Sequence, residues 1–348
     1  MSDRTPFILS HFPEETVGTW TQSHPIHVGL IHSTYRVETS KGSFCLQKLH
    51  PKLASDGILQ DYKVVTSHLA LHKFPAPEMI VTSNSALAFE DEDGARWRLT
   101  TWLDGENTST IRSNNMVRSA ASMFGQFHSL MKDLDYTFQS THPLHDTQHH
   151  LTNLRQAVSE HNDSPWFTKI ESMIAWVEDK LPPLILPEGL PTCVVHGDPK
   201  ISNLLFDSHD NAVALLDLDT CTLHSPLVDL GDAVRAWCCI KKDGADPEFS
   251  LPRYQCIMEG YAEHGPRLAA ENLERLPEAG LLITLELAAR FLADTLQDSY
   301  FAWDSQQYSS RSEHNAERAQ TMVTFSQKLE EALPQQRKTV ETILAQTS

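Results

Sequence analysis

One short stretch of this chain holds residue types that together could carry out phosphoryl transfer. Asp198 and Asn203 lie five positions apart in His196-Gly197-Asp198-Pro199-Lys200-Ile201-Ser202-Asn203, and Asp217 follows fourteen positions after Asn203. A carboxylate such as that of Asp198 can accept the proton of a hydroxyl that attacks a γ-phosphate. The amide oxygen of Asn203 and the carboxylate of Asp217 are hard oxygen ligands that suit Mg²⁺. The spacing therefore predicts a catalytic base and a metal site.

The elements around these residues must hold the base and the metal ligands on separate pieces of backbone. Apolar runs over 193–196, 203–206 and 212–218 predict three short strands that do this. Lys200, two residues after the base, can direct its ammonium toward the transferring phosphate. An isolated His-Gly-Asp would indicate only a surface turn, whereas the complete set between apolar strands argues against that interpretation.

The first hundred residues predict a small β-rich unit. Runs over 34–38 and 43–49 flank the turn residues 39–42, and runs over 86–89 and 96–103 flank 91–94, which indicates two hairpins. Apolar spacing over 56–72 predicts one helix, which Pro75 and Pro77 end.

After residue 103 the pattern becomes mainly helical. Helices are expected over 117–131, 226–241, 251–264, 279–298 and 312–333. We therefore predict an α+β, bilobal fold, with a β-sheet lobe over 1–103 and a mainly helical lobe over 104–348.

Composition narrows the class of protein. The chain of 348 residues has 28 Lys and Arg against 46 Asp and Glu, which gives a formal net charge of −18. Such a charge opposes binding to nucleic acid or anionic membranes. No basic segment followed by an apolar segment begins the chain, and no apolar run approaches membrane-spanning length. We expect a cytoplasmic monomer or homodimer with a small-molecule substrate.

Cysteines and histidines give weaker signals. None of the six cysteines forms a C-x-x-C pair, so reduced thiols are expected rather than a zinc site or a disulfide framework. His142, His145, His149 and His150 cluster, but their spacing lacks the H-E-x-x-H pattern of a metal-binding helix. Solvated or substrate-facing histidines are the better interpretation.

The catalytic stretch resembles the aminoglycoside phosphotransferase and choline kinase superfamily, whose signature is H-G-D-x-x-x-x-N followed by I-D-x-[DEG]. Three stretches are more similar still to bacterial N-acetylhexosamine 1-kinases: 29–35, the region from the catalytic loop through 217–220 and 229–232, and 286–294. The resemblance implies a protein-kinase-like fold, an ATP and Mg²⁺ requirement, and phosphorylation of an anomeric sugar hydroxyl.

The resemblance also implies residue roles. Asp198 would be the base, Asn203 and Asp217 would hold Mg²⁺ with help from Asp219, and Asp229 would brace the catalytic loop. The turn 29–35 would cover the ATP phosphates, with His32 and Thr34 near them. The hinge, Thr101 to Leu103, would meet adenine through its backbone.

Two departures from the pattern affect the nucleotide site. The phosphate-covering turn has a single glycine, Gly29, where protein kinases use three. The strand lysine that pairs with ATP phosphates is expected at Lys48, but a shift of one residue would put Gln47 on that face instead. The helix that follows has Asp61 and Lys63 where a partner glutamate is expected.

The helix expected over 279–298 carries candidate residues for binding the substrate. Glu286, Arg290 and Asp294 recur every four residues on an otherwise apolar helix, so they share one face. This face is either a salt-bridged surface or a set of hydrogen-bonding groups for sugar hydroxyls. Thr220 and His145 are further candidates.

Two other functions stay open. The acceptor can be another small molecule, such as an aminoglycoside, a choline-like amino alcohol or homoserine, although Arg290 disfavours a polycationic aminoglycoside. A nucleotide-binding pseudokinase is the non-catalytic alternative, and the intact Asp198, Asn203 and Asp217 argue against it.

Overall fold

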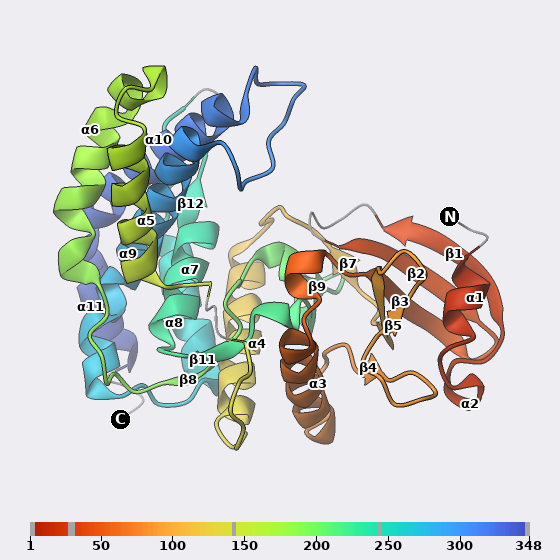
Figure 1. Cartoon of the computed structure of the whole chain (residues 1–348). Coiled ribbons are helices and arrows are strands. Elements are labelled where there is room, and N and C mark those ends of the chain that lie inside the picture. The colour runs from red at the N-terminus through yellow and green to blue at the C-terminus, as the bar shows by residue number, and fades with distance from the viewer. Residues whose placement is uncertain (1–3, 27–31, 141–143, 242–244, 345–348) are drawn as a thin grey trace. The chain divides into compact units, whose positions relative to one another are not determined.

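The computed structural model describes residues 4–26, 32–140, 144–241 and 245–344, which form two compact units (Figure 1). The first unit contains Met1–Thr108, Leu130–Thr141 and Ser202–Thr222. The second contains Ser109–Ser129, His142–Ile201 and Leu223–Ser348. The lobe boundary between residues 103 and 104 stays a prediction.

A six-stranded antiparallel sheet forms the centre of the first unit, in the order β1-β2-β3-β6-β4 with β5 paired to β6. The strands are β1 (Trp20–Ile26), β2 (Ser33–Thr39), β3 (Gly42–Lys48), β4 (Met79–Ile80), β5 (Phe89–Glu90) and β6 (Arg96–Thr101). Both hairpins predicted from the sequence are present, β2 with β3 and β5 with β6.

The register of β3 and β6 gives this sheet two different faces. Leu46 lies opposite Leu99, and the next pair is Gln47 opposite Arg98. Because successive side chains alternate across a strand, the two pairs point to opposite faces. The apolar face packs against α1 (Thr5–Leu9) and α2 (Glu14–Val17), which lie beside the sheet in Figure 1. The core on this face consists of Ile8, Leu9, Phe12, Val17, Val37, Phe44, Leu46, Trp97 and Leu99.

The predicted helix of the first unit is α3 (Asp56–Leu71), and Ser55 caps it by accepting a hydrogen bond from the Ile58 N–H. A short 3₁₀ turn, η1 (Pro51–Leu53), precedes it. Three strands from distant parts of the chain form a second sheet: β7 (Glu106–Asn107), β9 (Leu204–Phe206) and β10 (Ala212–Leu215). The 3₁₀ turns η3 (Ile201–Asn203) and η4 (Leu218–Thr220) flank β9 and β10 in the chain.

The second unit is mainly helical, as predicted. Its helices are α4 (Asn114–Met131), α5 (Thr147–Glu160), α6 (Pro165–Lys180), α7 (Leu227–Cys238), α8 (Leu251–His264), α9 (Ala270–Gln297), α10 (Arg311–Glu331) and α11 (Leu333–Leu344). The remaining elements are η2 (Pro182–Leu184), the paired strands β8 (Cys193–Val195) and β11 (Thr222–His224), and the paired strands β12 (Cys239–Ile240) and β13 (Glu248–Phe249).

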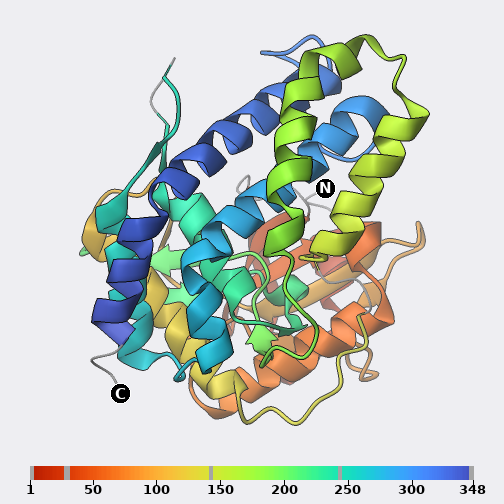
Figure 2. The same ribbon diagram turned by 90° about the vertical axis from the view of Figure 1, so that its left-hand side faces the viewer.

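Helix α9 organises this unit, since it contacts α5, α6, α7, α10 and α11 (Figure 2). It begins at Ala270, not at Ala279 as the sequence predicts, because the helix continues through Pro277. Proline usually ends or kinks a helix, so the sequence predicted a helix that begins only after Pro277. The pattern also left α5 and α6 unassigned.

The predicted α+β fold class is confirmed, with an antiparallel sheet toward the N-terminus and helices toward the C-terminus. Across the described part of the chain, no helix combines the length and the apolar character needed to cross a membrane.

Candidate active site

The loop that carries Asp198 is anchored to helix α7 by one buried carboxylate. Asp229 accepts hydrogen bonds from the backbone N–H groups of His196, at 2.7 Å, and Gly197, at 2.8 Å. His128 Nε2 lies 2.9 Å from the same carboxylate. Burial alone would raise the pKa of Asp229, but these partners outweigh it and hold the pKa below its ordinary value. Asp229 is therefore a fixed anion that sets the start of the loop.

Gly197 gives this loop its shape. Its φ of +84° lies in the region that side chains with a Cβ rarely adopt, so glycine is required at this position. Asp198 follows directly, and its N–H is 3.2 Å from His196 Nδ1. Lys200 was predicted to direct its ammonium toward the phosphate, and in the structure its Nζ lies 2.6 Å from Asp198 Oδ2 on a half-exposed side chain.

Two further charges of the second unit lie on α7. Arg235 Nε donates to Asp232 Oδ1 at 2.5 Å, and both side chains are largely buried. Burial opposes the charge on each group, but the attraction between them outweighs it, so the pKa of Asp232 is lowered and that of Arg235 is raised. Asp198 adds to the attraction on Arg235. The charge of Arg235 therefore interacts with that of the candidate base.

In the first unit, the backbone brings Asn203 and Asp217 close together. The Leu216 N–H donates to the Asn203 carbonyl at 2.8 Å, so the residue before Asp217 is bonded to Asn203. Asn107 supports the turn by donating to the carbonyls of Ser202, at 2.6 Å, and Leu204, at 3.3 Å. Asp217 has φ of +59° and ψ of +56°, a left-handed conformation that is uncommon outside glycine. Strain of this kind concentrates at functional sites.

Arg98 is the centre of the charged face of the main sheet. Its Nη1 and Nη2 donate to the two oxygens of Asp219 at 2.5 and 2.8 Å. Its Nε and Nη2 donate to Gln47 Oε1 at 3.2 and 2.8 Å, and its guanidinium stacks 3.9 Å from the centroid of the Tyr62 ring. The side chain is 1% exposed, so this is a buried bidentate ion pair.

This pairing occupies both oxygens of Asp219. Burial alone would raise the pKa of Asp219, but Arg98 outweighs it and holds that pKa well below its ordinary value. His32 Nε2 is 3.4 Å from Asp219 Oδ2, which is too long for an ordinary hydrogen bond, while His32 Nδ1 accepts from the His50 N–H at 3.0 Å. Asp219 therefore anchors Arg98, a contact that the sequence did not predict.

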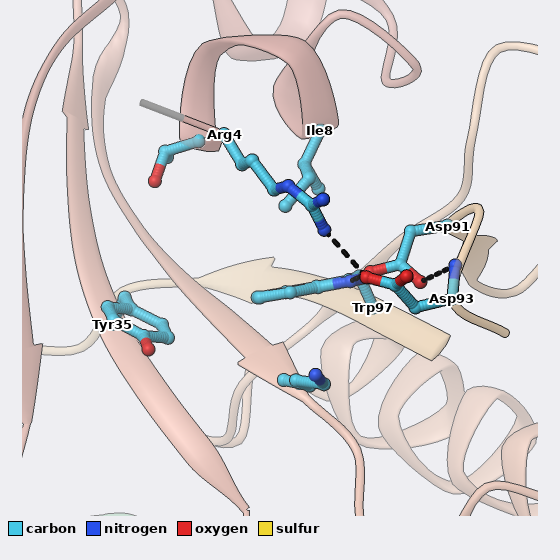
Figure 3. A pocket seen from close by; sticks show the side chains of 8 residues that line it. Arg4, Ile8, Tyr35, Asp91, Asp93 and Trp97 are labelled. Atoms are coloured by element: carbon cyan, nitrogen blue, oxygen red, sulfur yellow. Dashed lines mark hydrogen bonds and ion pairs between the residues drawn. The ribbon is translucent and has the colours of Figure 1, made fainter. Parts of the chain in front are cut away.

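Lys48 lies on the other face of the sheet. It is paired with Trp97, one position from the Gln47–Arg98 pair, and it lines a cavity of about 410 Å³ on the α1 side (Figure 3). Arg4 and Asp93 form an ion pair of 2.8 Å at this cavity. Of the two candidates for the strand position, Gln47 is the one that contacts Arg98, and Lys48 lies on the opposite face of the strand.

The other predicted nucleotide residues lie in the first unit. Thr34 pairs with Gln47 across β2 and β3. Thr101 ends β6, and its hydroxyl accepts from the Glu78 N–H at 2.9 Å. Leu103 lies just after β6 and is half-buried. Gly29 lies outside the described residues.

Asp61 lies on α3, the helix that carries the partner glutamate of the strand lysine in protein kinases, but its carboxylate has a different role. Its carboxylate accepts from Tyr136 Oη at 2.8 Å and from the N–H groups of Gln139 and Ser140 at 2.9 and 2.8 Å. It therefore holds the segment 136–140 and does not pair with a strand lysine.

The predicted substrate residues fall into different environments. His145 contacts Glu286 and the Gly197 carbonyl. Arg290 is half-buried, with its guanidinium 5.6 Å from the Phe301 ring centroid. Thr220 ends the turn η4 in the first unit.

Asp294 is engaged by the protein itself. Its carboxylate accepts hydrogen bonds of 2.7 to 2.9 Å from the N–H groups of Ser299, Tyr300 and Phe301 and from Asn315 Nδ2. These contacts close the C-terminal end of α9, so the structure gives Asp294 a structural role that the sequence did not predict.

The sequence predicted no role for three charged residues: Arg98 in the first unit, and Asp232 and Arg235 in the second. A signal existed for some of them. Arg98 is a cation between Trp97 and Leu99 in a strand, and Asp232 and Arg235 are opposite charges one helical turn apart in an apolar segment. Within the described ranges, no group of three or more His, Cys, Asp or Glu side chains could hold a metal ion. A site at Asn203 and Asp217 would need the amide oxygen and other ligands.

Comparison with known proteins gives consistent results. The family model described as "Phosphotransferase enzyme family" matches residues 23–264. A homoserine kinase of Bartonella tribocorum is 23% identical over 284 residues, covering 81% of this chain and 82% of that protein. A microcompartment-associated aminopropanol kinase has a TM-score of 0.65 at 14% identity, covering 96% of this chain and 98% of that one. An amicoumacin kinase in complex with AMP-PNP and Ca²⁺ has a TM-score of 0.58 at 15% identity, covering 90% and 89%.

Proposed function

The chain belongs to the phosphotransferase enzyme family, and we propose that it uses ATP and Mg²⁺ to phosphorylate a hydroxyl group of a small molecule. The observation that carries the proposal is the anchored loop of Asp198. Asp229 fixes the two residues before Asp198, so its carboxylate is held on a rigid support. A positioned carboxylate of this kind can accept the proton of the attacking hydroxyl.

Lys200 supports the same reaction. Its ammonium is 2.6 Å from Asp198 Oδ2 on a half-exposed side chain, so it can exchange this contact for one with a phosphoryl oxygen. A cation at that place would stabilise the negative charge on the transferring group.

For the metal, we propose Asn203 and Asp217 without Asp219. The first two supply hard oxygen atoms from adjoining segments, and Asp217 is held in a strained conformation. Asp219 has both oxygens on Arg98, which leaves it the role of an anchor. When bound, Mg²⁺ would neutralise charge on the ATP phosphates.

For the nucleotide, we propose Gln47 in place of Lys48, together with His32, Thr34 and the hinge from Thr101 to Leu103. Gln47 shares its face of the sheet with Arg98, whereas Lys48 shares a face with the apolar core. The backbone of the hinge is the proposed contact for adenine.

The acceptor we propose first is the anomeric hydroxyl of an N-acetylhexosamine or related sugar. This rests on the similarity of residues 217–220 and 286–294 to sugar 1-kinases, with Thr220 and Arg290 as hydrogen-bonding groups. Asp294 is left out, because its carboxylate is used by the loop that follows α9.

A second acceptor, a hydroxy amino acid such as homoserine, is favoured by Arg235. Its Nε donates to Asp232, and among the described residues none accepts a hydrogen bond from its two terminal nitrogens. A guanidinium near the base would suit an acceptor carboxylate. The similarity to a homoserine kinase supports the same candidate. Cations near the base oppose an aminoglycoside, whose amines need acidic partners.

The test is ADP release from Mg·ATP with a panel of free sugars, homoserine, choline, aminopropanol and aminoglycosides. We expect turnover with N-acetylglucosamine or N-acetylgalactosamine that is lost with the methyl glycoside, in which the anomeric hydroxyl is blocked. The variant Asp198→Asn should lose at least about 1,000-fold in kcat, since it removes the base and keeps the shape of the side chain.

Other outcomes decide between the candidates. Turnover with homoserine alone, reduced in Arg235→Met, would replace the sugar with the amino acid. Asp198→Asn with near-normal kcat would contradict the assignment of the base. Nucleotide binding without turnover across the panel would favour a pseudokinase.

A further inference from the structure

The His145 ring lies between two groups that can only accept hydrogen bonds. Its Nδ1 is 2.8 Å from Glu286 Oε1, and its Nε2 is 3.1 Å from the carbonyl oxygen of Gly197. A neutral imidazole has one N–H, so it could donate to only one of them, whereas an imidazolium donates to both. The geometry therefore requires one additional proton on the His145–Glu286 pair.

The surroundings place that proton on the ring. Both side chains are buried, His145 at 7% exposure and Glu286 at 1%. Burial by itself lowers the pKa of His145, but the Glu286 carboxylate outweighs it and raises that pKa above its ordinary value of 6.5. Burial likewise raises the pKa of Glu286, but His145 outweighs it and lowers that pKa. Thr147 Oγ1 also donates to Glu286 Oε2 at 2.5 Å, which favours the carboxylate.

Two neighbouring histidines show the opposite pattern. His224 Nε2 lies 3.1 Å from the His145 carbonyl, and His224 Nδ1 accepts from the Ser225 N–H at 2.8 Å, so a neutral ring satisfies both contacts. His150 Nε2 lies 2.9 Å from the Leu144 carbonyl. Burial lowers the pKa of both rings. Among these three rings, the contacts call for a second proton on His145.

The contact with Gly197 reaches the catalytic loop. The Gly197 carbonyl belongs to the same peptide unit as the Asp198 N–H, which is bonded to His196 Nδ1. On its other side, the Gly197 N–H is bonded to Asp229. A peptide unit held at its oxygen and its nitrogen has a fixed plane, and this plane sets the direction in which Asp198 leaves the backbone.

We propose that protonated His145, paired with Glu286, is a positioning residue for the base: it holds the Gly197 carbonyl, and loss of its second proton as the pH rises frees the loop and lowers turnover. The effect on turnover rests on the proposed kinase function, whereas the protonation state and the loop contact do not. His145 thereby contributes through the backbone and not through the acceptor contact that the sequence predicts.

The pH dependence follows from the direction of the shifts. The pKa of His145 is raised, so the contact is present at and below its ordinary value and is lost as the pH rises through the raised value. The pKa of Glu286 is lowered, so its carboxylate loses its negative charge only when the pH falls below the ordinary range of a glutamate. The charged or titratable groups that face the pair are Asp229 and Asp232 on α7, His149 and His150 on α5, Arg290 on α9, and His224 on β11.

The first test uses nuclear magnetic resonance of the full chain with ¹⁵N-labelled histidine and no substrate. His145 is identified by the signals that disappear in His145→Gln, and His224 serves as the neutral control. We expect both His145 ring nitrogens to be mostly protonated at about pH 6.5, the ordinary pKa of histidine, and the Asp198 backbone amide to shift with the same midpoint as the ring. A singly protonated His145 ring at that pH, or an Asp198 amide that ignores its titration, would overturn the proposal.

The second test measures kcat against pH with whichever acceptor the panel identifies. Glu286→Gln removes the anion and keeps the size, so the alkaline limb should move to lower pH by about one unit or more. His145→Gln should lower kcat by roughly 10- to 100-fold and remove that limb, with little change in the KM for ATP. His150→Gln, which leaves the pair intact, should keep the limb in place.

These two tests distinguish a failure of the proposed kinase function from a failure of the proposed role of His145. Turnover that persists with an unshifted alkaline limb in Glu286→Gln would overturn the role of His145 and leave the kinase intact. If no acceptor is found, the proposed function fails, and the two resonance measurements still decide whether protonated His145 holds the loop.

Discussion

Arg98 is almost completely buried, and an unpaired charge in such a place costs several kcal/mol. Asp219 and Gln47 offset this cost by accepting from Nε, Nη1 and Nη2, and Tyr62 covers the guanidinium. Protein kinases place a strand lysine and a helix glutamate near the nucleotide. Here a strand arginine pairs with the second aspartate of the Asp-x-Asp motif.

Because one partner of a buried pair cannot be removed without leaving the other charge unpaired, Asp219→Asn should lower the free energy of unfolding by about 3–5 kcal/mol. Urea unfolding followed by circular dichroism measures this. The exposed pair of the same unit gives the control: Arg4→Met breaks the contact with Asp93 and should have no measurable effect. A loss below about 1 kcal/mol in Asp219→Asn would show that Arg98 does not depend on this anion.

Secondary-structure elements were predictable where the apolar period was regular. The alternation in 34–38 and 43–49 identified β2 and β3, and apolar spacing identified α3 and α8. The sequence pattern does not give the register of the strands, so either Gln47 or Lys48 could face the nucleotide. The pairing of β3 with β6 decides between them, because it puts Gln47 opposite Arg98. Helix α5 was missed because its buried face is narrow, with Leu151, Leu154 and Ala157 among polar residues.

For helix α7, the sequence predicts which side chains lie on the same side of the helix, but not what that helix packs against. Asp229, Asp232 and Arg235 recur every three residues, which places them on one side of the helix. Gly231 packs so closely on α9 that an added Cβ would lie 2.4 Å from the Ala279 carbonyl oxygen.

We therefore expect Gly231→Ala to separate α7 from α9, lowering the free energy of unfolding by about 1–3 kcal/mol and reducing kcat, since Asp229 moves with its helix. Gly57→Ala in α3 is the matched control. Its added Cβ would lie 3.3 Å from Gln139 Cβ and 3.5 Å from the Gln139 carbonyl oxygen, much less close than at Gly231, and alanine favours the helix, so stability should change by less than about 1 kcal/mol. Unchanged unfolding and activity in Gly231→Ala would mean that the α7–α9 contact adjusts without cost.

At the scale of the whole molecule, the sequence predicted the class of fold and the motif, and it missed contacts between distant residues. Arg98 and Asp219 are 121 positions apart, and His145 and Glu286 are 141 apart. Such pairs depend on the tertiary fold, so local spacing gave no signal for the first. For the second, the sequence identified Glu286 as part of a polar face and His145 as a substrate candidate, but it did not pair them.

The net charge of −18 should make the stability of the whole molecule depend on salt concentration. Repulsion among surface carboxylates destabilises a compact chain, and salt screens it, with a Debye length that falls from about 10 Å at 0.1 M to about 3 Å at 1 M. The buried pairs at Asp219 and Asp229 are shielded from this screening. We expect the urea midpoint at about pH 7 to rise between roughly 0.05 and 0.5 M NaCl.

Potassium chloride at equal ionic strength serves as the control and should give the same rise, because screening does not depend on which monovalent cation is used. A rise with NaCl alone would indicate specific cation binding. A midpoint that falls with both salts would show that attractive surface pairs, such as Arg118 with Glu263 and Arg155 with Glu178, outweigh the net repulsion.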